Sequence, residues 1–187
     1  MKFERQAIAD VVRITPERKQ DNRGYFSEVY KDDWFRNTVA DVAFVQDNQS
    51  LSMDVGTVRG LHFQLEPFAQ GKLVRCLSGA IFDVAVDIRQ GSPTYGHWVG
   101  AELSAENGDQ LWIPAGFAHG FATLKPATLI HYKVTAPYSA AHDRGLCWND
   151  PDIAIDWPVS KDEAVLSDKD RQQPSLADLP ASFHYPR

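Results

Sequence analysis

The sequence is short of several features that would each define a class of protein. Only two of its 187 residues are cysteine, Cys76 and Cys147, and they lie far apart without the spacing of a metal or redox motif. This argues against a disulfide framework and fits a reducing cytosol. No apolar run approaches membrane-spanning length, and the N-terminal MKFERQAIAD has no apolar signal-peptide core. We therefore expect a cytoplasmic protein without a membrane segment.

Positive charge is scarce as well. The formal net charge is -6 at pH 7, from 19 Lys and Arg against 25 Asp and Glu. Broad nucleic-acid binding needs a basic face, so we predict no nucleic-acid partner. A small anionic ligand is still compatible with this charge, because a local cluster of cations sets the field inside a pocket. A glycine-rich phosphate loop and a dinucleotide fingerprint are both missing, which argues against a bound nicotinamide.

What is present is a series of short strand-like segments with turn residues between them. Length and composition, with 43% hydrophobic residues, predict a single domain over residues 1–187 with N- and C-terminal extensions. Strand patterns with little helix between them predict an all-β sandwich or barrel. The predicted strands cover residues 8–15, 25–30, 43–52, 79–88, 95–103, 107–113, 116–123 and 129–135.

Two short helices are predicted outside this series. One covers residues 32–38, with Asp32 or Asp33 as its N-cap. The other is C-terminal, because Ser160-Lys161-Asp162-Glu163 matches a capping box.

The segment with the densest chemistry is GTVRGLHFQLEPFAQGKLVR, residues 56–75. It reads as two short strands joined at a Glu-Pro turn, with His62 and Gln64 on one face of the first strand. A single histidine in a strand is often only structural, but here Arg59 and Lys72 are near in sequence and Gly60 allows close backbone approach. His62 is therefore a candidate general base acting on an anionic substrate.

Metal binding is the rival explanation of His62. Zinc or iron on a β-barrel usually needs two or three histidines with a carboxylate, often as His-x-His on one strand. The pattern here is His62-Phe63-Gln64, and His119 is the only other plausible donor in a β core motif. We therefore expect no metal.

Three other positions could complete an acid–base site. Tyr132 is either a core aromatic or a phenol that supplies a proton to a carbanion. Asp168 or Asp170 could orient an imidazole, as in base–carboxylate pairs. His119, between two glycines, is either a loop histidine bonded to the backbone or a hydrogen-bond donor to a phosphate or carbonyl oxygen.

Further polar residues suggest a binding surface. Gln46, Asn48 and Ser50 fall on one face of a predicted strand, which is either the wall of a wet pocket or a solvated edge. Tyr138 could stack on a nucleobase. Five charged residues could clamp a pyrophosphate and position a sugar, although most surface charges are merely solvated: Arg23, Glu28, Arg59, Lys72 and Lys169.

Several motifs, in order along nearly the whole chain, resemble the dTDP-4-dehydrorhamnose 3,5-epimerase family. They are DNRGYFSE (21–28), QDNQS (46–50), GTVRGLHFQ (56–64), QGKLVR (70–75), IPAGFAHGF (113–121), HYKVTAPY (131–138), WNDPDIAIDWP (148–158) and LSDKD (166–170). The order and coverage make the resemblance far more specific than any one motif.

The resemblance implies a cupin-type jelly roll that forms a homodimer, with an N-terminal strand exchanged between subunits. It implies a nucleotide-sugar isomerase of rhamnose biosynthesis that needs no cofactor. The substrate would be dTDP-4-dehydro-6-deoxy-D-glucose and the product dTDP-4-dehydro-L-rhamnose. The alternatives are an epimerase that inverts only C3 or C5, a 3,4-ketoisomerase on the same fold, a non-catalytic sugar-binding module, or a metal-dependent cupin enzyme.

The resemblance also implies roles for single residues. His62 matches the catalytic base, Asp170 its orienting partner, Tyr132 the acid and Lys72 the group near the 4-keto oxygen. Tyr138 matches the base-stacking tyrosine. The remaining expected substrate contacts are Arg23, Phe26, Glu28, Gln46, Asn48, Arg59, His119, Asp143 and Lys169. At Asp143 the family often has Glu, so the carboxylate is kept but its side chain is shorter.

Overall fold

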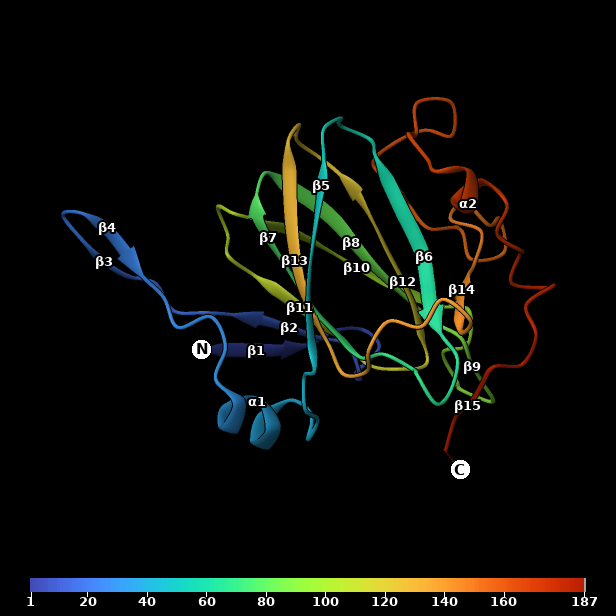
Figure 1. Cartoon of the computed structure of the whole chain (residues 1–187), viewed down its shortest axis with the longest axis horizontal. Helices are drawn as coiled ribbons and strands as arrows, with labels where there is room; N and C mark the ends of the chain where they lie inside the picture. Colours follow the sequence, from blue (N-terminus) through green and yellow to red (C-terminus); the bar gives the residue numbers. More distant parts are fainter. Residues whose placement is uncertain (187) are drawn as a thin grey trace.

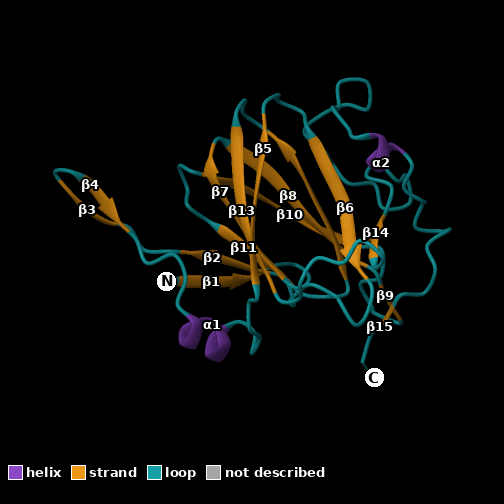
Figure 2. Ribbon diagram, viewed as in Figure 1, coloured by secondary structure: helices purple, strands orange, loops and turns teal. Residues whose placement is uncertain are grey.

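The structure, a computed structural model, describes residues 1–186 and consists mainly of two packed antiparallel sheets (Figures 1 and 2). In spatial order, the six-stranded sheet contains β1 (Lys2–Arg5), β2 (Val12–Thr15), β11 (Gln110–Ile113), β7 (Lys72–Ser78), β13 (Thr128–Val134) and β5 (Gln46–Ser52). The five-stranded sheet contains β10 (Trp98–Ser104), β8 (Ala80–Asp87), β12 (Phe117–Thr123), β6 (Val58–Gln64) and β14 (Asp143–Gly145). The all-β, cupin-type jelly-roll prediction is confirmed.

Smaller elements flank the two sheets. Strands β3 (Lys19–Asp21) and β4 (Gly24–Phe26) form a separate hairpin, and β15 (Phe183–His184) pairs with β9 (Arg89–Gln90). The helices are α1 (Asp32–Thr38) and α2 (Asp168–Arg171). Neither helix is long or apolar enough to cross a membrane, and no other helix of residues 1–186 is. Cys76 and Cys147 are both free thiols.

The main core lies between the two sheets, because side chains of alternating residues point inward from each strand. Val74 and Ile130 from one sheet meet Ile81, Ala85 and Phe121 from the other. This burial removes apolar surface from water and supplies most of the driving force for the sandwich. The rigid wall that results carries the polar residues of the site.

The outer faces of both sheets are covered too. Phe35 of α1 is 1% exposed and packs with Leu73 and Trp112 on the outer face of the six-stranded sheet. Burying such a ring contributes about 2 kcal/mol to stability. On the other side, the C-terminal segment packs Ile153 and its neighbours against the five-stranded sheet. The C-terminal extension is therefore part of the packed structure and brings α2 to the sheets.

The prediction that residues 56–75 form a hairpin is wrong. Strands β6 and β7 are consecutive in the chain, but β6 pairs with β12 and β14 while β7 pairs with β11 and β13. The segment between them crosses from one sheet to the other. Local turn chemistry at Glu66-Pro67 suggested a hairpin, but burial of two apolar faces places the strands in opposite layers. His62 and Lys72 consequently face one another across the sandwich.

The helix predictions are right in number and wrong in detail. Helix α1 has the expected limits, but its N-cap is Lys31, which makes no side-chain cap; Asp32 lies in the first turn instead. Ser160 starts only a turn, in which its hydroxyl bonds to the Glu163 carboxylate at 2.6 Å. The C-terminal helix α2 begins later, where the Ser167 hydroxyl caps the Asp170 amide.

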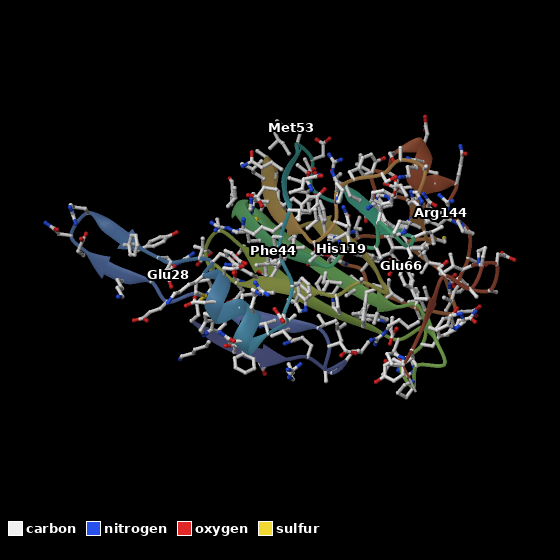
Figure 3. All side chains as sticks on the ribbon, turned by 60° about the horizontal axis from the view of Figure 1, so that its bottom comes forward. Glu28, Phe44, Met53, Glu66, His119 and Arg144 are labelled. Carbon is white, nitrogen blue, oxygen red and sulfur yellow. The ribbon has the colours of Figure 1, made fainter. Side chains whose placement is uncertain are left out.

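The N-terminal region differs most from the expected strands. Strand β2 is shorter than the predicted residues 8–15, and β1, which precedes it, was not expected. Residues 25–30 form a strand only as far as Phe26. The hairpin of β3 and β4, which we call the arm (residues 19–26), extends away from the two sheets in Figure 1. In Figure 3, Glu28 lies on the arm side of the molecule, whereas His119 lies among the strands.

Candidate active site

A cavity of about 640 Å³ opens between the two sheets. Strands β5, β7 and β13 form one wall, β6, β12 and β14 form the other, and the segment leading into α2 closes one side. Of the fourteen predicted site residues, eleven line this cavity: Gln46, Asn48, Arg59, His62, Lys72, His119, Tyr132, Tyr138, Asp143, Lys169 and Asp170. The cavity thus brings together residues from six strands and the C-terminal segment.

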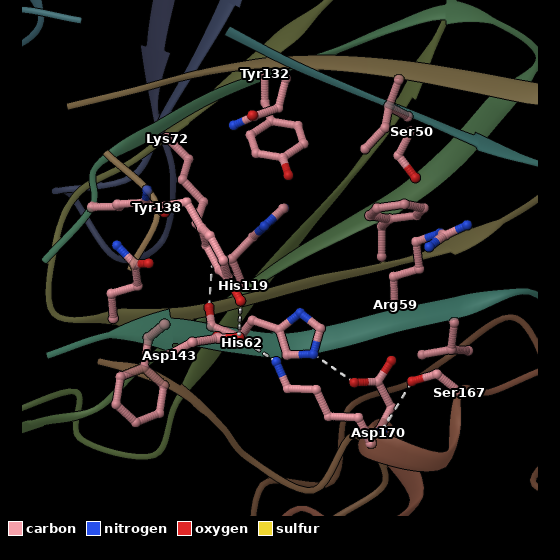
Figure 4. Close-up of a pocket in the computed structure, with 18 of the residues that line it drawn as sticks. Ser50, Arg59, His62, Lys72, His119, Tyr132, Tyr138, Asp143, Ser167 and Asp170 are labelled. Carbon is pink, nitrogen blue, oxygen red and sulfur yellow. Dashed lines mark hydrogen bonds and ion pairs between the residues drawn. The ribbon is translucent and has the colours of Figure 1, made fainter. Parts of the chain in front are cut away.

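His62 and Asp170 form a close side-chain contact in the cavity (Figure 4). Nε2 of His62 lies 2.5 Å from Oδ1 of Asp170, which is 4% exposed. Burial alone would raise the pKa of Asp170, but the hydrogen bond and charge of His62, with help from Ser167 and the Gly60 amide, hold it below its ordinary value. The ionised carboxylate therefore accepts from Nε2 and leaves Nδ1 of His62 as the nitrogen available for proton transfer.

Lys72 lies on the opposite wall from His62 and is almost fully buried. Its Nζ donates to the carbonyl oxygen of His62 at 3.1 Å. Burial lowers the pKa of Lys72 to about 8, against the opposing effect of the Asp83 and Asp143 carboxylates. At neutral pH the side chain is still mostly an ammonium group.

Tyr132 stands across the cavity from His62. It lies on β13 with Ile130 and Val134 on the same inward face, as predicted. Its hydroxyl points toward the middle of the cavity in Figure 4. Burial raises the pKa of this phenol above its ordinary value, so the hydroxyl keeps its proton at neutral pH. The site therefore holds a base and a proton donor on opposite walls.

The amide-bearing face of β5 lines the cavity, as the pocket-wall interpretation predicts. β5 is also the edge strand of its sheet, and its other face is exposed to solvent. Gln46 and Asn48 are linked by a hydrogen bond of 2.7 Å, and Ser50 continues the same face. On the other face, Asp47 pairs with Lys133 of β13 at 2.9 Å. Because side chains alternate between the two faces of a strand, the Asp47–Lys133 ion pair lies on the face of β5 that points away from the cavity.

Arg59 joins the cavity through an irregularity in β6. Strict alternation would place it on the face opposite His62, but the pairing of β6 with β12 shifts register between Arg59 and His62. Gly60 makes this possible, because a Cβ there would lie 2.6 Å from the Cα of Gly120. The Arg59 guanidinium bonds to the Ser52 hydroxyl and the Leu51 carbonyl, both at 3.1 Å. It is thereby positioned at the cavity beside β5.

Three predicted residues form a linked group in the cavity wall. Asp143 of β14 accepts a hydrogen bond from the Tyr138 hydroxyl at 3.2 Å and forms an ion pair with Lys169. The Tyr138 ring is 60% exposed, so its face is open to a ligand. The shorter carboxylate that the sequence has at this position still reaches both neighbours.

His119 has a partner that sequence reasoning missed. Its Nε2 lies 2.8 Å from Oδ1 of Asp83, which is completely buried on β8. Burial lowers the pKa of His119, with the nearby Asp83 carboxylate opposing that shift. An aspartate inside an otherwise apolar strand was the available sequence signal. Cavity residues outside the predicted set include Ser50, Gln64, Gln70 and Ser167.

Three predicted residues are not in the cavity: Arg23, Phe26 and Glu28. Arg23 and Phe26 lie on the arm, where Arg23 pairs with Asp21 at 2.6 Å. Phe26 is 70% exposed, and its neighbour Tyr25 is 56% exposed. The intrachain fold therefore separates these residues from the cavity that the other eleven share.

The donor groups of the cavity are not arranged for a metal. Within residues 1–186, no group of three or more His, Cys, Asp and Glu side chains is placed to hold a metal ion. What the arrangement offers instead is a base with its carboxylate, a facing phenol and a buried ammonium group.

The sequence matches the family model described as dTDP-4-dehydrorhamnose 3,5-epimerase over residues 5–178. A dTDP-4-dehydrorhamnose 3,5-epimerase of Sinorhizobium fredii (strain NBRC 101917 / NGR234) is 68% identical over 185 residues, which is 99% of this chain and 94% of that protein. The Pseudomonas aeruginosa enzyme of the same name is 51% identical, covering 95% of this chain and 97% of its own length.

The fold is similar to a solved structure with a bound ligand. A dTDP-6-deoxy-D-glucose-3,5-epimerase from Legionella pneumophila Philadelphia 1, in complex with dTDP-4-keto-L-rhamnose, superposes with a TM-score of 0.95 at 41% identity. The similarity covers 100% of this chain and 99% of that one. The cavity described above lies within this shared fold.

Proposed function

The chain belongs to the dTDP-4-dehydrorhamnose 3,5-epimerase family and is an isomerase, and from this premise we propose how its own residues carry out the reaction. The substrate is dTDP-4-dehydro-6-deoxy-D-glucose, and inversion at C3 and C5 gives dTDP-4-dehydro-L-rhamnose. The observation that carries the proposal is the His62–Asp170 pair at 2.5 Å, facing Tyr132 across a cavity that also contains Lys72.

The first requirement of the reaction is to remove a hydrogen next to a ketone. Such a hydrogen is too weakly acidic for an imidazole in water, unless a cation stabilises the negative charge that develops on the ketone oxygen. Lys72 provides that cation, because it is buried, mostly protonated at neutral pH and fixed to the His62 carbonyl. A charge in a site that excludes water stabilises an enolate far more than the same charge in solvent.

His62 takes the proton from C3 or C5 through Nδ1. Asp170 holds the ring in the tautomer with the proton on Nε2 and stabilises the imidazolium that forms. The fixed ring matters because proton transfer needs the base within hydrogen-bond reach of the carbon-bound hydrogen.

Inversion needs the new proton to arrive from the opposite face of the sugar. Tyr132 supplies it, since its protonated hydroxyl lies on the wall across from His62. C3 and C5 flank the same carbonyl group, so one base and one acid serve both carbons if the sugar ring adjusts between the two steps.

The remaining cavity residues bind the nucleotide. Arg59 and Lys169 offer cations to the diphosphate, and the Gln46 and Asn48 amides offer neutral hydrogen bonds beside them. The exposed ring of Tyr138 stacks on the thymine base. Asp143 holds both Tyr138 and Lys169 in place for these contacts.

The arm completes the site of a second copy of the chain. Arg23 and Phe26 extend away from the cavity of their own chain, and Glu28 follows at the base of the arm. We infer a homodimer in which each arm places these residues beside the partner's cavity. The exposed Phe26 ring would then be covered, and a cation and a carboxylate would be added to the nucleotide contacts.

Incubation with the dTDP-linked 4-keto-6-deoxy sugar in heavy water tests the reaction. We expect deuterium at both C3 and C5 and an L-rhamno product by NMR. Deuterium at one carbon only would replace the proposal by a single-site epimerase, and movement of the keto group from C4 to C3 would indicate a ketoisomerase. Absence of exchange with retained binding would leave a sugar-binding module.

A further inference from the structure

Asp83 is an unusual residue within the core of this fold. It lies in the middle of β8, is 0% exposed, and points between the two sheets together with Ile81 and Ala85. One of its oxygens, Oδ1, meets His119, but Oδ2 has no hydrogen-bond partner in the described part of the chain. A buried carboxylate oxygen without a partner is costly, so its retention calls for a function.

The position of Asp83 places it directly behind the cavity. In the pairing of β8 with β12, Asp83 is opposite Phe121 and His119 is opposite Ala85, so Asp83 and His119 are diagonal neighbours on the inward face. In the pairing of β12 with β6, His119 lies directly opposite His62. A chain of contacts therefore leads from the buried carboxylate to a cavity-lining imidazole beside the proposed base.

Asp83 also acts on Lys72 from across the sandwich. The charged groups that act on the buried ammonium group are Asp83 from β8, Asp143 from β14 and Lys169 from α2. The imidazoles of His62 and His119 and the phenol of Tyr132 line the same cavity. Burial lowers the pKa of Lys72, Lys169 adds to that shift, and Asp83 is the strongest opposing influence, followed by Asp143. Asp143 is already neutralised by its ion pair with Lys169, whereas Asp83 has no cation of its own.

We propose that Asp83 is a positioning residue for the reaction, which fixes the tautomer of His119 and supplies the counter-charge that keeps Lys72 an ammonium group. This inference rests on the proposed function and deepens it. Asp83 does not reach the cavity, so it acts only through these two residues.

The tautomer decides what His119 recognises. A carboxylate accepts hydrogen bonds, so Nε2 of His119 carries the proton and Nδ1 presents a lone pair. Because the ring stays neutral at neutral pH, His119 accepts a hydrogen bond through Nδ1. This differs from the donor role toward a phosphate or carbonyl oxygen expected from sequence. The group that fits is a hydroxyl of the sugar, whose O–H donates.

A second aspartate on β8 provides a matched control. Asp87 is four residues from Asp83 and equally buried, but it is not part of the cavity wall. Its carboxylate accepts from Arg89, Ser92 and Thr94, at distances between 2.6 and 2.8 Å. Asp87→Asn is therefore the same chemical change on the same strand at a purely structural carboxylate.

The counter-charge is tested by following the Lys72 ammonium signal in the free enzyme by NMR as pH is raised. In Asp83→Asn we expect the titration midpoint to fall by at least about one pH unit, a tenfold change in the protonation equilibrium. The alkaline limb of kcat/KM should move by the same amount. In Asp87→Asn both should stay within a few tenths of a unit of the wild type. An unchanged Lys72 midpoint in Asp83→Asn would overturn the counter-charge role.

The tautomer is tested first on the unmodified protein, so the main result does not depend on whether a variant folds. The ¹⁵N spectrum of His119 should show a protonated Nε2 and an unprotonated Nδ1, and Asp83→Leu should give a mixture of tautomers. A proton on Nδ1 in the wild type would contradict the inference. Both NMR readouts are made without substrate, so they remain decisive even if the heavy-water experiment rejects double epimerisation.

Discussion

The cavity and the arm hold residues of one proposed site, but they are built in opposite ways. In the cavity, His62, Lys72 and Tyr132 lie on paired strands, and each is backed by a packed core. In the arm, Arg23 and Phe26 lie on a two-stranded hairpin that is exposed along its length. Proton transfer needs groups held to within fractions of an ångström, whereas holding a nucleotide tolerates a surface that is completed on assembly. This difference suggests that the chemistry belongs to one subunit and part of the binding to its partner.

Loss of the base should have the largest effect, and it should be confined to chemistry. We expect His62→Asn to lower kcat by about 10⁴-fold, the upper end of general-base contributions. Exchange of the C3 and C5 hydrogens with heavy water should stop, while dTDP affinity measured by calorimetry changes less than about twofold, because binding rests on other residues. Retained exchange would remove His62 as the base.

Loss of the buried cation should have the next largest effect. Lys72→Met keeps an unbranched side chain of nearly the same length and removes its charge, and kcat should fall by about 10²- to 10³-fold, as for other groups that stabilise an oxyanion. In the wild type, the role of Lys72 should be visible in the pH dependence of kcat/KM. Lys72 has a pKa of about 8 and acts as the ammonium form, so kcat/KM should fall as pH rises above about 8. A profile that stays level to pH 10 would contradict this role.

Tyr132→Phe should separate the two proton transfers. Removing the hydroxyl leaves the base intact, so we expect epimerisation to fall by about 10²-fold while some hydrogen exchange from the substrate persists. The ratio of exchange to inversion, measured by NMR in heavy water, checks this. If turnover were equal to that of the wild type, another group would be the acid.

Changes in the arm should be milder and should act on binding. We expect Phe26→Ala and Glu28→Gln each to raise KM by about five- to tenfold with kcat nearly unchanged, as when uniform binding is removed. Gln20→Ala serves as a control on the same hairpin, because Gln20 lies on β3 and is not among the proposed nucleotide contacts. A fall in kcat without a change in KM would mean that the arm takes part in the chemistry.

Chelation should have the smallest effect. The proposed cavity chemistry uses only side chains of the protein, so exhaustive treatment with EDTA, followed by assay in metal-free buffer, should leave kcat/KM unchanged within error. A loss that added metal restores would revive the metal-dependent alternative.

How much of this could be predicted from sequence depended on the range of the interactions involved. The inward face of β5 and the inward direction of Tyr132 on β13 could be predicted, because the alternation of side chains along a strand is a local property. The hairpin over residues 56–75 was wrong because the partners of β6 and β7 are set by distant strands. The capping-box signal at Ser160 was equally local, and it gave only a turn with a hydrogen bond from Ser160 to Glu163.

The site shows the same limit. Spacing and family resemblance brought His62, Asp170 and Lys72 together, and the cavity indeed contains all three. Arg59 reaches it only through the register shift at Gly60, which no periodicity reveals. Asp83 was visible as an interruption of an apolar strand, but its pairing with His119 depends on the alignment of β8 with β12.

Subunit complementation tests the division between cavity and arm most directly. One variant carries His62→Asn with a wild-type arm, and the other carries Arg23→Ala, Phe26→Ala and Glu28→Gln with a wild-type cavity. If each arm serves the partner's cavity, a mixed dimer regains one complete site, and at low substrate concentration activity rises on mixing to well above that of either variant alone. Activity that stays at the average of the two parents would contradict an arm that acts between subunits.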